Sequence, residues 1–260
     1  PYGNWKFIPA PVRPYYLKRV TLFGAESTGK TTLADLLAAR AAGAKTVGGI
    51  LGAEGGHALS GDLANLDRLY DAGFRLIGLT HFFDNELGAS LHGEAGEAGG
   101  LTDFGRSVVR AMIEKDMIID LAHSSPTMAR EVLAMVDRPV VVSHTGIYSQ
   151  CPSHRNFPDA LMREIAARGG LIGIGYWAEV VCDPTPKGIA TSIRAAIELV
   201  GPDHVALGSD FDGAVETTFD TSELAALTQA LLDQGLDEGT IAKIMGGNMV
   251  HFLQAALPEG

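Results

Sequence analysis

The chain has 260 residues, of which 46% are hydrophobic and 20% charged, proportions that exclude a largely disordered protein. Its 20 Lys and Arg residues against 31 Asp and Glu give a net charge of −11, which argues against nucleic acid and an anionic membrane surface as partners. No apolar run reaches the roughly 18 residues that span a bilayer. Cys151 and Cys182 are too few for a disulfide framework, so we expect a reducing, cytoplasmic compartment, with one bridge as the alternative.

The N-terminal region contains a phosphate-binding motif. Residues 1–18 are rich in Pro and aromatic residues and predict an extended arm. A strand is expected at Arg19–Phe23 and a helix at about Thr31–Ala42, on either side of a G-x-x-x-x-G-K-T sequence. A strand, this loop and a helix in that order are the context of a P-loop, in which backbone N–H groups bind phosphate. The candidate phosphate-binding residues are Gly24, Gly29, Lys30 and Thr31.

The rest of the chain alternates short apolar runs with amphipathic helical patterns. Runs of four to six apolar residues without alternation are typical of strands buried on both faces of a parallel sheet. The expected strands are Val47–Leu51, Leu76–Thr80, Met117–Leu121, Val140–Ser143, Leu171–Ile174 and Val205–Gly208. The expected helices are Ser125–Met135, Asp159–Arg168, Thr185–Val200 and Thr221–Gln234, and a Gly-rich loop is expected at Leu87–Gly100. Repeated strand-helix units predict an α/β fold, and the length suits a barrel of about 250 residues.

A polar residue follows each of these predicted strands. They are Glu54, His81, His123, His144, Tyr176 and Asp210. In a parallel barrel the carboxyl ends of the strands meet at one face, which holds the active site. Two His and a carboxylate are ligands suited to Zn²⁺, and a bound Zn²⁺ makes hydroxide available near neutral pH. The pattern therefore predicts metal-assisted hydrolysis of an amide or ester.

From about Lys45 onward the chain resembles the membrane (renal) dipeptidase family, the M19 metallopeptidases. The matching segments, in family order, are Gly52–His57, Leu79–His81, Asp120–Ser124, Val142–Thr145, Ser153–Asn156, Gly208–Gly213 and Gly246–Asn248. The resemblance implies a (β/α)₈ barrel of TIM type, two Zn²⁺ ions, a dipeptide substrate and a homodimer.

The resemblance also assigns roles to individual residues. Glu54 matches the carboxylate that bridges the two metals, and His123 and His144 match the ligands of one of them. Asp210 matches a ligand of the other metal that also transfers the proton. His81 matches the residue that stabilises the oxyanion. Arg155 matches the residue that binds the substrate carboxylate, and Tyr176 falls at a substrate-pocket position.

One departure from the family stands out. The family begins with a His-x-Asp pair on its first strand that ligates the second metal, but this chain has no His before His57 and no His-x-Asp sequence. The resemblance therefore predicts a barrel lacking the family's first βα units, one complete metal site and a second site with too few ligands. Full dipeptidase activity is in question for the same reason.

Instead of those units, the chain carries the P-loop-like strand and helix. Residues from about Trp5 to Leu37 resemble the P-loop segment of NadR-type nicotinamide ribonucleoside kinases, with Ile8-Pro9 and Val12-Arg-Pro14 in place. We therefore expect an N-terminal unit, residues 1–44, and a dipeptidase-like barrel domain, residues 45–260. Two alternatives to a zinc-dependent dipeptidase stay open. One is a P-loop nucleotide-binding or kinase-like protein, and the other is a catalytically inactive fragment of the barrel.

Overall fold

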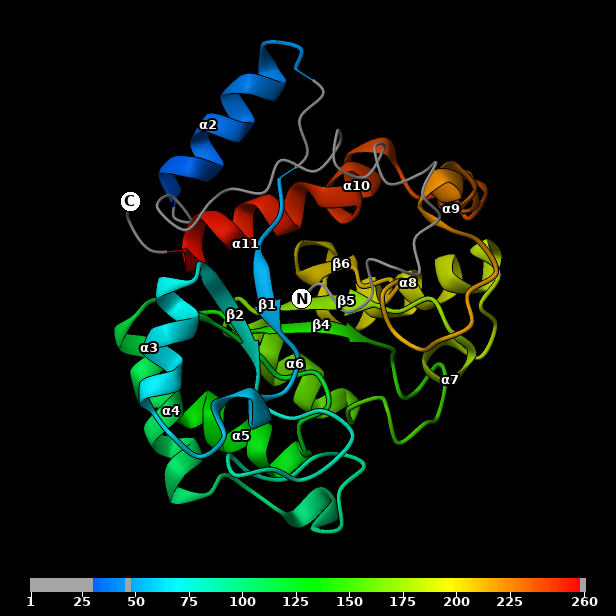
Figure 1. Ribbon diagram of the computed structural model, residues 1–260. Coiled ribbons are helices and arrows are strands. Elements are labelled where there is room, and N and C mark those ends of the chain that lie inside the picture. The colour runs from blue at the N-terminus through cyan, green and yellow to red at the C-terminus, as the bar shows by residue number, and fades with distance from the viewer. Residues whose placement is uncertain (1–29, 45–47, 258–260) are drawn as a thin grey trace, which may run out of the picture.

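The protein is an α/β structure built on one parallel sheet. The computed structural model describes residues 30–44 and 48–257. The strands lie side by side in chain order (Figure 1) and are β1 Leu51–Ala53, β2 Phe74–Gly78, β3 Ile118–Asp120, β4 Val141–Thr145, β5 Leu171–Ile174 and β6 Val205–Leu207. The helices are α2 Lys30–Ala41, α3 Ala64–Asp71, α4 Asp103–Glu114, α5 Pro126–Met135, α6 Asp159–Ala167, α7 Ala178–Val181, α8 Pro186–Val200, α9 Leu224–Asp233, α10 Glu238–Ala242 and α11 Asn248–Ala256. The predicted fold class is confirmed.

Most predicted strands are found within a few residues of their expected positions. β5 coincides with the prediction, whereas β1 begins at Leu51 and not at Val47. The reason is the pairing with β2, whose first register pair joins Leu51 to Phe74. Val47 itself lies outside the described residues, as do the predicted arm and the predicted strand Arg19–Phe23.

Both faces of the sheet are buried at its central strands β3, β4 and β5, as expected for strands without alternation. Adjacent residues of β3 show the two faces. Ile119 packs in the larger cluster with residues of α4, α5 and α8. Ile118 points to the opposite face and packs with Phe252 of α11. The loops between strands therefore project from the ends of the sheet, where polar residues are tolerated.

Helix α11 covers the face of the sheet opposite the main helical layer, and α2 lies beside it (Figure 1). Phe252, Ala256 and Leu257 pack with Leu33 of α2 and with the inner strand residues. Asn248 anchors the start of α11 by donating to the carbonyl oxygens of Pro202, at 2.7 Å, and Val205, at 2.8 Å. This helix was not predicted from the sequence.

Local capping fixes where the helices after β3 and β5 begin. Ser125 Oγ accepts from Met128 N–H at 3.0 Å at the start of α5. Thr185 Oγ1 accepts from Gly188 N–H at 3.2 Å at the start of α8. A proline follows each cap, which suits the first helical turn because its missing N–H has no intrahelical partner there.

The sheet has two outer edges. Among the described residues, no further strand pairs with β1 or β6, so this part of the chain holds six of the eight strands of a closed barrel of this kind. A cavity of 760 Å³ is lined by residues of both edge strands and of α11. Ile50 and Leu51 are 40% and 38% exposed there. The open side of the sheet therefore presents apolar surface and unpaired backbone groups.

Cys151 and Cys182 form a disulfide. This is the single bridge that the sequence left open as the alternative, and it forms because the loop after β4 brings Cys151 beside the end of α7 although 31 residues separate the two cysteines. Disulfides persist in oxidising compartments. Within the described ranges, we find no helix with the length and apolar character needed to cross a bilayer.

Candidate metal centre

Glu54 is placed by a glycine turn at the end of β1. Gly55 has a φ of 95°, a conformation that L side chains rarely adopt. A Cβ atom at this position would also collide with the ring of His57. The turn is fixed by hydrogen bonds from Gly55 N–H to Gly78 O and from Gly56 N–H to Leu79 O, both 3.0 Å. Glu54 is thereby held over the ends of β1 and β2.

Two histidines come from the neighbouring strands. His144 lies within β4, and His123 follows β3 by three residues. His123 has a φ of 63°, a left-handed conformation that costs a non-glycine residue about 1–3 kcal/mol. His123 is nevertheless buried, at 3% exposed, and His144 is also buried, at 8%. The fold thus keeps a strained backbone to direct His123 into the site.

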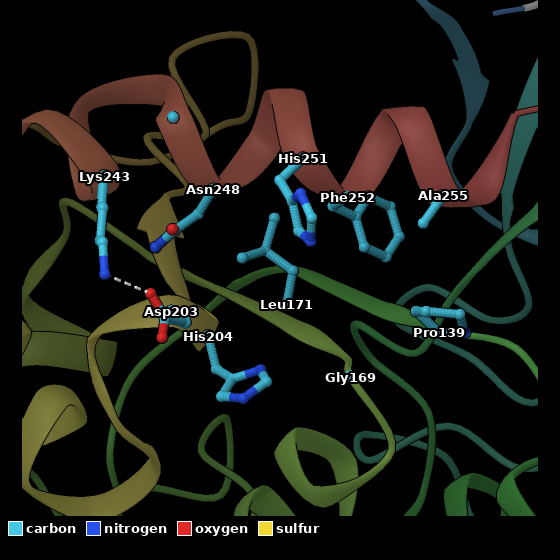
Figure 2. A pocket seen from close by; sticks show the side chains of 11 residues that line it. Pro139, Gly169, Leu171, Asp203, His204, Lys243, Asn248, His251, Phe252 and Ala255 are labelled. Carbon is cyan, nitrogen blue, oxygen red and sulfur yellow. Dashed lines mark hydrogen bonds and ion pairs between the residues drawn. The ribbon is translucent and has the colours of Figure 1, made fainter.

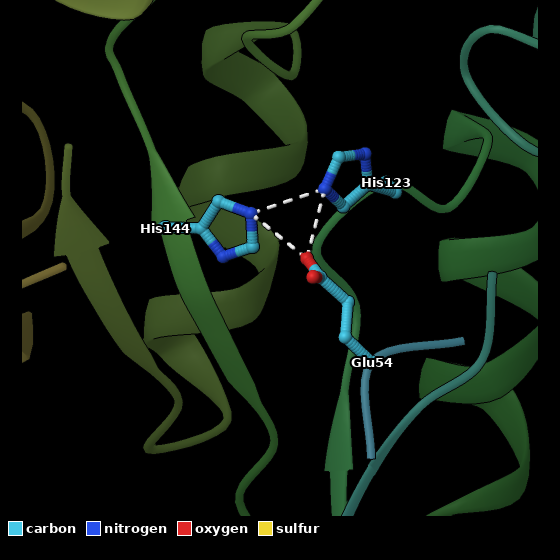
Figure 3. A group of neighbouring side chains, drawn as sticks. All are labelled: Glu54, His123 and His144. Carbon is cyan, nitrogen blue, oxygen red and sulfur yellow. Dashed lines mark hydrogen bonds and ion pairs between the residues drawn. The ribbon is translucent and has the colours of Figure 1, made fainter. Parts of the chain in front are cut away.

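The three side chains converge from separate strand ends (Figure 3). Glu54 Oε1 lies 3.1 Å from His123 Nε2 and 3.3 Å from His144 Nε2. The two Nε2 atoms are 3.0 Å apart. Among the described residues this is the one group of three or more such ligands whose donor atoms all lie within 4.8 Å of one another.

The protonation states suit a divalent cation. Burial lowers the pKa of His123 to about 3, so the imidazole is neutral. Hydrogen bonds from His123 and His144 hold the pKa of Glu54 far below its ordinary value, so the carboxylate is ionised. His144 Nδ1 contacts Ser143 Oγ at 2.8 Å, so Nε2 is the ring nitrogen that faces Glu54 and His123. In metal sites, the ring nitrogen that does not bind the metal is usually hydrogen-bonded to a neighbouring group in this way. The donor set therefore fits Zn²⁺.

His81 and Asp210 lie around this group without being part of it. His81 Nε2 is 3.6 Å from Glu54 Oε2. Asp210 follows β6 with a φ of 56° and lines the same cavity as Glu54 and His144. Burial raises the pKa of Asp210, while the proximity of His144 opposes the rise. A carboxyl with a raised pKa is suited to accept and return a proton.

Arg155 lies against both histidines. Its guanidinium is buried, and Nη2 lies 3.1 Å from His123 Nε2 and donates to His144 O at 3.2 Å. Burial lowers its pKa to about 10, which leaves it charged at neutral pH. The ring of Trp177 lies 5.7 Å from the guanidinium carbon. Arg155 is therefore a fixed positive charge beside the candidate ligands and not a surface ion pair.

Tyr176 is fully buried and is not exposed at the cavity surface. Its ring packs against Phe211 and Phe219, with centroid distances of 5.5 and 5.2 Å. Its hydroxyl has no hydrogen-bond partner within the described parts of the chain. The structure thus places Tyr176 behind the loop that carries Asp210.

The candidate phosphate-binding residues divide between two regions. Gly24 and Gly29 lie outside the described residues, and Lys30 and Thr31 are the first two residues of α2. Phosphate binding by these residues stays a prediction.

Sequence reasoning missed several residues of the site. Phe82 and His92 pack beside His123, with ring centroids 5.4 and 5.7 Å away, and Trp177 lies 5.8 Å from His144. Asp120 is 4% exposed at the end of β3. Its signal was available in the sequence, since a carboxylate at the end of a buried strand requires partners.

A second cavity, of 550 Å³, lies at the opposite ends of the strands (Figure 2). It is bounded by α11 and by the residues that precede β4, β5 and β6. Lys243 and Asp203 form an ion pair of 2.7 Å at its side. No residue of the candidate metal centre lines it.

The sequence matches the family described as Membrane dipeptidase (Peptidase family M19) over residues 23–257, a region that includes the predicted phosphate loop. The chain is 33% identical over 215 residues to dipeptidase aclJ of Aspergillus oryzae, covering 80% of this chain and 51% of that protein. It therefore spans about half the length of this curated relative.

Solved structures share the fold. A metallo peptidase from Rhodobacter sphaeroides, liganded with a phosphinate mimic of the dipeptide L-Ala-D-Ala, superposes with a TM-score of 0.76 at 26% identity, covering 86% of this chain and 67% of that one. The probable dipeptidase PvdM from Pseudomonas aeruginosa gives a TM-score of 0.81 at 20% identity, covering 97% and 77%. The match along almost the whole sequence, together with the strand-end site, shows that the chain belongs to the membrane dipeptidase family, peptidase family M19.

Proposed function

We propose that the protein is a metal-dependent dipeptidase that holds one Zn²⁺ with Glu54, His123 and His144. The observation that carries this proposal is the convergence of these three donor atoms at the carboxyl ends of β1, β3 and β4. Membership of the M19 family and similarity to dipeptidases support the substrate class. We propose a single ion because these three side chains are the one group of three or more such ligands among the described residues.

A bound Zn²⁺ lowers the pKa of water and polarises a carbonyl group. The residues of the chain supply the rest. Arg155 binds the substrate's carboxylate, because its planar guanidinium matches two carboxylate oxygens. His81 donates a hydrogen bond to the oxygen that becomes negative as the peptide bond is attacked. Asp210 accepts the proton of the attacking water and delivers it to the leaving amine.

Substrate contact by Tyr176 stays a prediction from the family resemblance, and its side chain is buried behind the Asp210 loop. The homodimer and the cytoplasmic location stay predictions. The disulfide favours an oxidising compartment over the cytoplasm.

The deciding experiment measures metal content per chain and hydrolysis of a simple dipeptide with and without a chelator. One Zn²⁺ per chain with chelator-sensitive turnover would support the proposal. Metal without turnover would favour the inactive alternative. Tight ATP binding that is lost in Lys30→Ala would favour the P-loop alternative.

A further inference from the structure

The junction between β3 and β4 carries both candidate histidine ligands, yet it has the sparsest backbone pairing in the sheet. A single register pair, Asp120 with Val141, joins the two strands. The neighbouring junctions β2–β3 and β4–β5 have three pairs each. One more backbone hydrogen bond, from Leu121 N–H to Val141 O at 2.8 Å, closes this junction. Backbone pairing alone therefore constrains the two strand ends weakly.

The side chain of Asp120 supplies the missing connection. Its Oδ1 atom accepts from Ala122 N–H at 3.0 Å and from Ser143 N–H at 2.9 Å. Ala122 precedes His123, and Ser143 precedes His144. One carboxylate oxygen thus holds the backbone immediately before each histidine.

The surroundings make these hydrogen bonds consequential. Asp120 is only 4% exposed, so water cannot replace its carboxylate as a hydrogen-bond acceptor. Without Asp120, the two N–H groups would be buried donors with no acceptor, and such groups are rare in folded proteins. His123 also needs support, because its left-handed backbone persists only when neighbouring contacts hold it. Among the charges around Arg155, that of Asp120 does most to counter the effect of burial on the Arg155 pKa.

We propose that Asp120 is a positioning residue that sets the separation of His123 and His144 by holding the N–H groups that precede them. It acts on the metal site through the backbone, and in that respect the inference rests on the proposed function. Outer-shell partners of this kind typically change metal affinity by about 10–100-fold when removed.

Three variants of the full chain test the proposal. Asp120→Ala removes the acceptor. Asp120→Asn keeps an oxygen acceptor of the same size without the charge. Glu131→Ala is the matched control, because Glu131 also accepts from a backbone N–H, that of Leu101 at 2.7 Å, but outside the metal centre. For each, the Co²⁺ dissociation constant is measured by chelator competition, together with the visible spectrum of bound Co²⁺.

We expect Asp120→Ala to raise the Co²⁺ dissociation constant by about 10–100-fold and to change the spectrum, whereas Asp120→Asn and Glu131→Ala leave both close to wild type. Unchanged affinity and spectrum in Asp120→Ala would overturn the proposal. If that variant does not fold, Asp120→Asn decides, because loss of the wild-type spectrum there would show that the hydrogen-bond acceptor is not what matters.

A metal-free measurement separates this proposal from the proposed function. Amide hydrogen exchange at Ala122 and Ser143 should be slow in wild type and Asp120→Asn, and faster in Asp120→Ala than in Glu131→Ala. If the wild-type protein binds no Co²⁺, the proposed function fails, and the exchange rates still decide the role of Asp120. Slow exchange at both amides in Asp120→Ala would refute it.

Discussion

The disulfide between Cys151 and Cys182 links the loop that carries Arg155 to the C-terminal end of α7. Trp177 lies at the other end of this short helix, immediately before its first residue. Asn156 reinforces the same connection by donating to Cys151 O at 2.8 Å and to Val180 O at 2.9 Å. The loop that presents Arg155, the proposed carboxylate-binding residue, is therefore fixed at Cys151 and at Asn156.

Removing the disulfide should loosen this loop. A crosslink closing a loop of this length contributes about 3–4 kcal/mol in the chain-entropy model, so the double variant Cys151→Ser and Cys182→Ser should unfold at lower urea concentration. Its KM for a dipeptide should rise more than its kcat falls. Thiol titration of the unfolded wild-type chain should find two thiols only after reduction. Two thiols without reductant would contradict the bond.

Arg155 should discriminate between free and blocked carboxyl termini. In wild type, a dipeptide should be cleaved far faster than the same dipeptide with a C-terminal amide. Arg155→Lys keeps a charge but not the planar fork, and we expect kcat/KM for the free dipeptide to fall by about 10²-fold. Its value for the amide should change little. An equal loss for both substrates would show that Arg155 supports the fold and does not bind the carboxylate.

Metal binding at the candidate centre can be followed by tryptophan fluorescence. Trp177 lies 5.8 Å from His144, and the other tryptophan of the chain, Trp5, can be replaced by Phe to leave one emitter. Co²⁺ should quench Trp177 in this background. His144→Ala should abolish quenching and reduce turnover by more than about 10²-fold, since a ligand matters more than its outer-shell partners. Quenching that persists in His144→Ala would place the ion elsewhere.

Tyr176 should affect stability through its hydroxyl. A buried hydroxyl without a partner is unfavourable by about 1–3 kcal/mol, so Tyr176→Phe should leave stability unchanged or raise it. Burial also raises the pKa of the Tyr176 phenol above its ordinary value. The folded state therefore keeps the phenol neutral, and wild type should lose stability as the pH rises above about 10, where the unfolded phenol ionises.

Tyr176→Phe should lose less stability than wild type between pH 8 and a pH of about 10.5, as measured by urea unfolding at both pH values. The same variant tests the family-based expectation of substrate contact. Dipeptide kcat/KM close to wild type would assign Tyr176 to packing, whereas a large drop in kcat/KM would return it to the substrate site.

The predicted phosphate loop has its own test. Lys30→Ala should leave dipeptide hydrolysis unchanged, because none of the residues around Glu54 belongs to α2. The predicted phosphate binding requires that, in equilibrium dialysis with labelled ATP, wild type retains ATP and Lys30→Ala does not, and equal retention by the two would contradict it. ATP retention by wild type alone would establish a nucleotide site that dipeptidase chemistry does not require.

The sequence was informative where a property is local. Apolar runs without alternation identified the six strands of the described residues. Strands that are buried on both faces consist of nearly continuous hydrophobic residues, and this pattern is visible in the sequence of each strand by itself. Polar residues after those runs identified the candidate ligands, because carboxyl ends of parallel strands meet at one face. That rule gave six candidates, and the resemblance to the M19 family selected Glu54, His123 and His144 among them.

What could not be predicted depends on contacts between distant segments. The disulfide forms only because the loop after β4 lies against α7. The position of α11 depends on a face of the sheet that the other helices leave uncovered. The role of Asp120 depends on the Ser143 amide, 23 residues away. None of these contacts between distant segments can be inferred from the spacing of residues along the chain.

In this sheet every strand pairs only with the strands before and after it in the chain. Each pairing is thus closed within one strand-helix-strand module, and no contact between the first and last strands is needed to form the others. Glu54 follows β1, His123 follows β3 and His144 lies in β4, so the candidate metal centre needs all the modules from β1 to β4 in place together. A change in the packing of any one of these modules would therefore move one ligand relative to the other two.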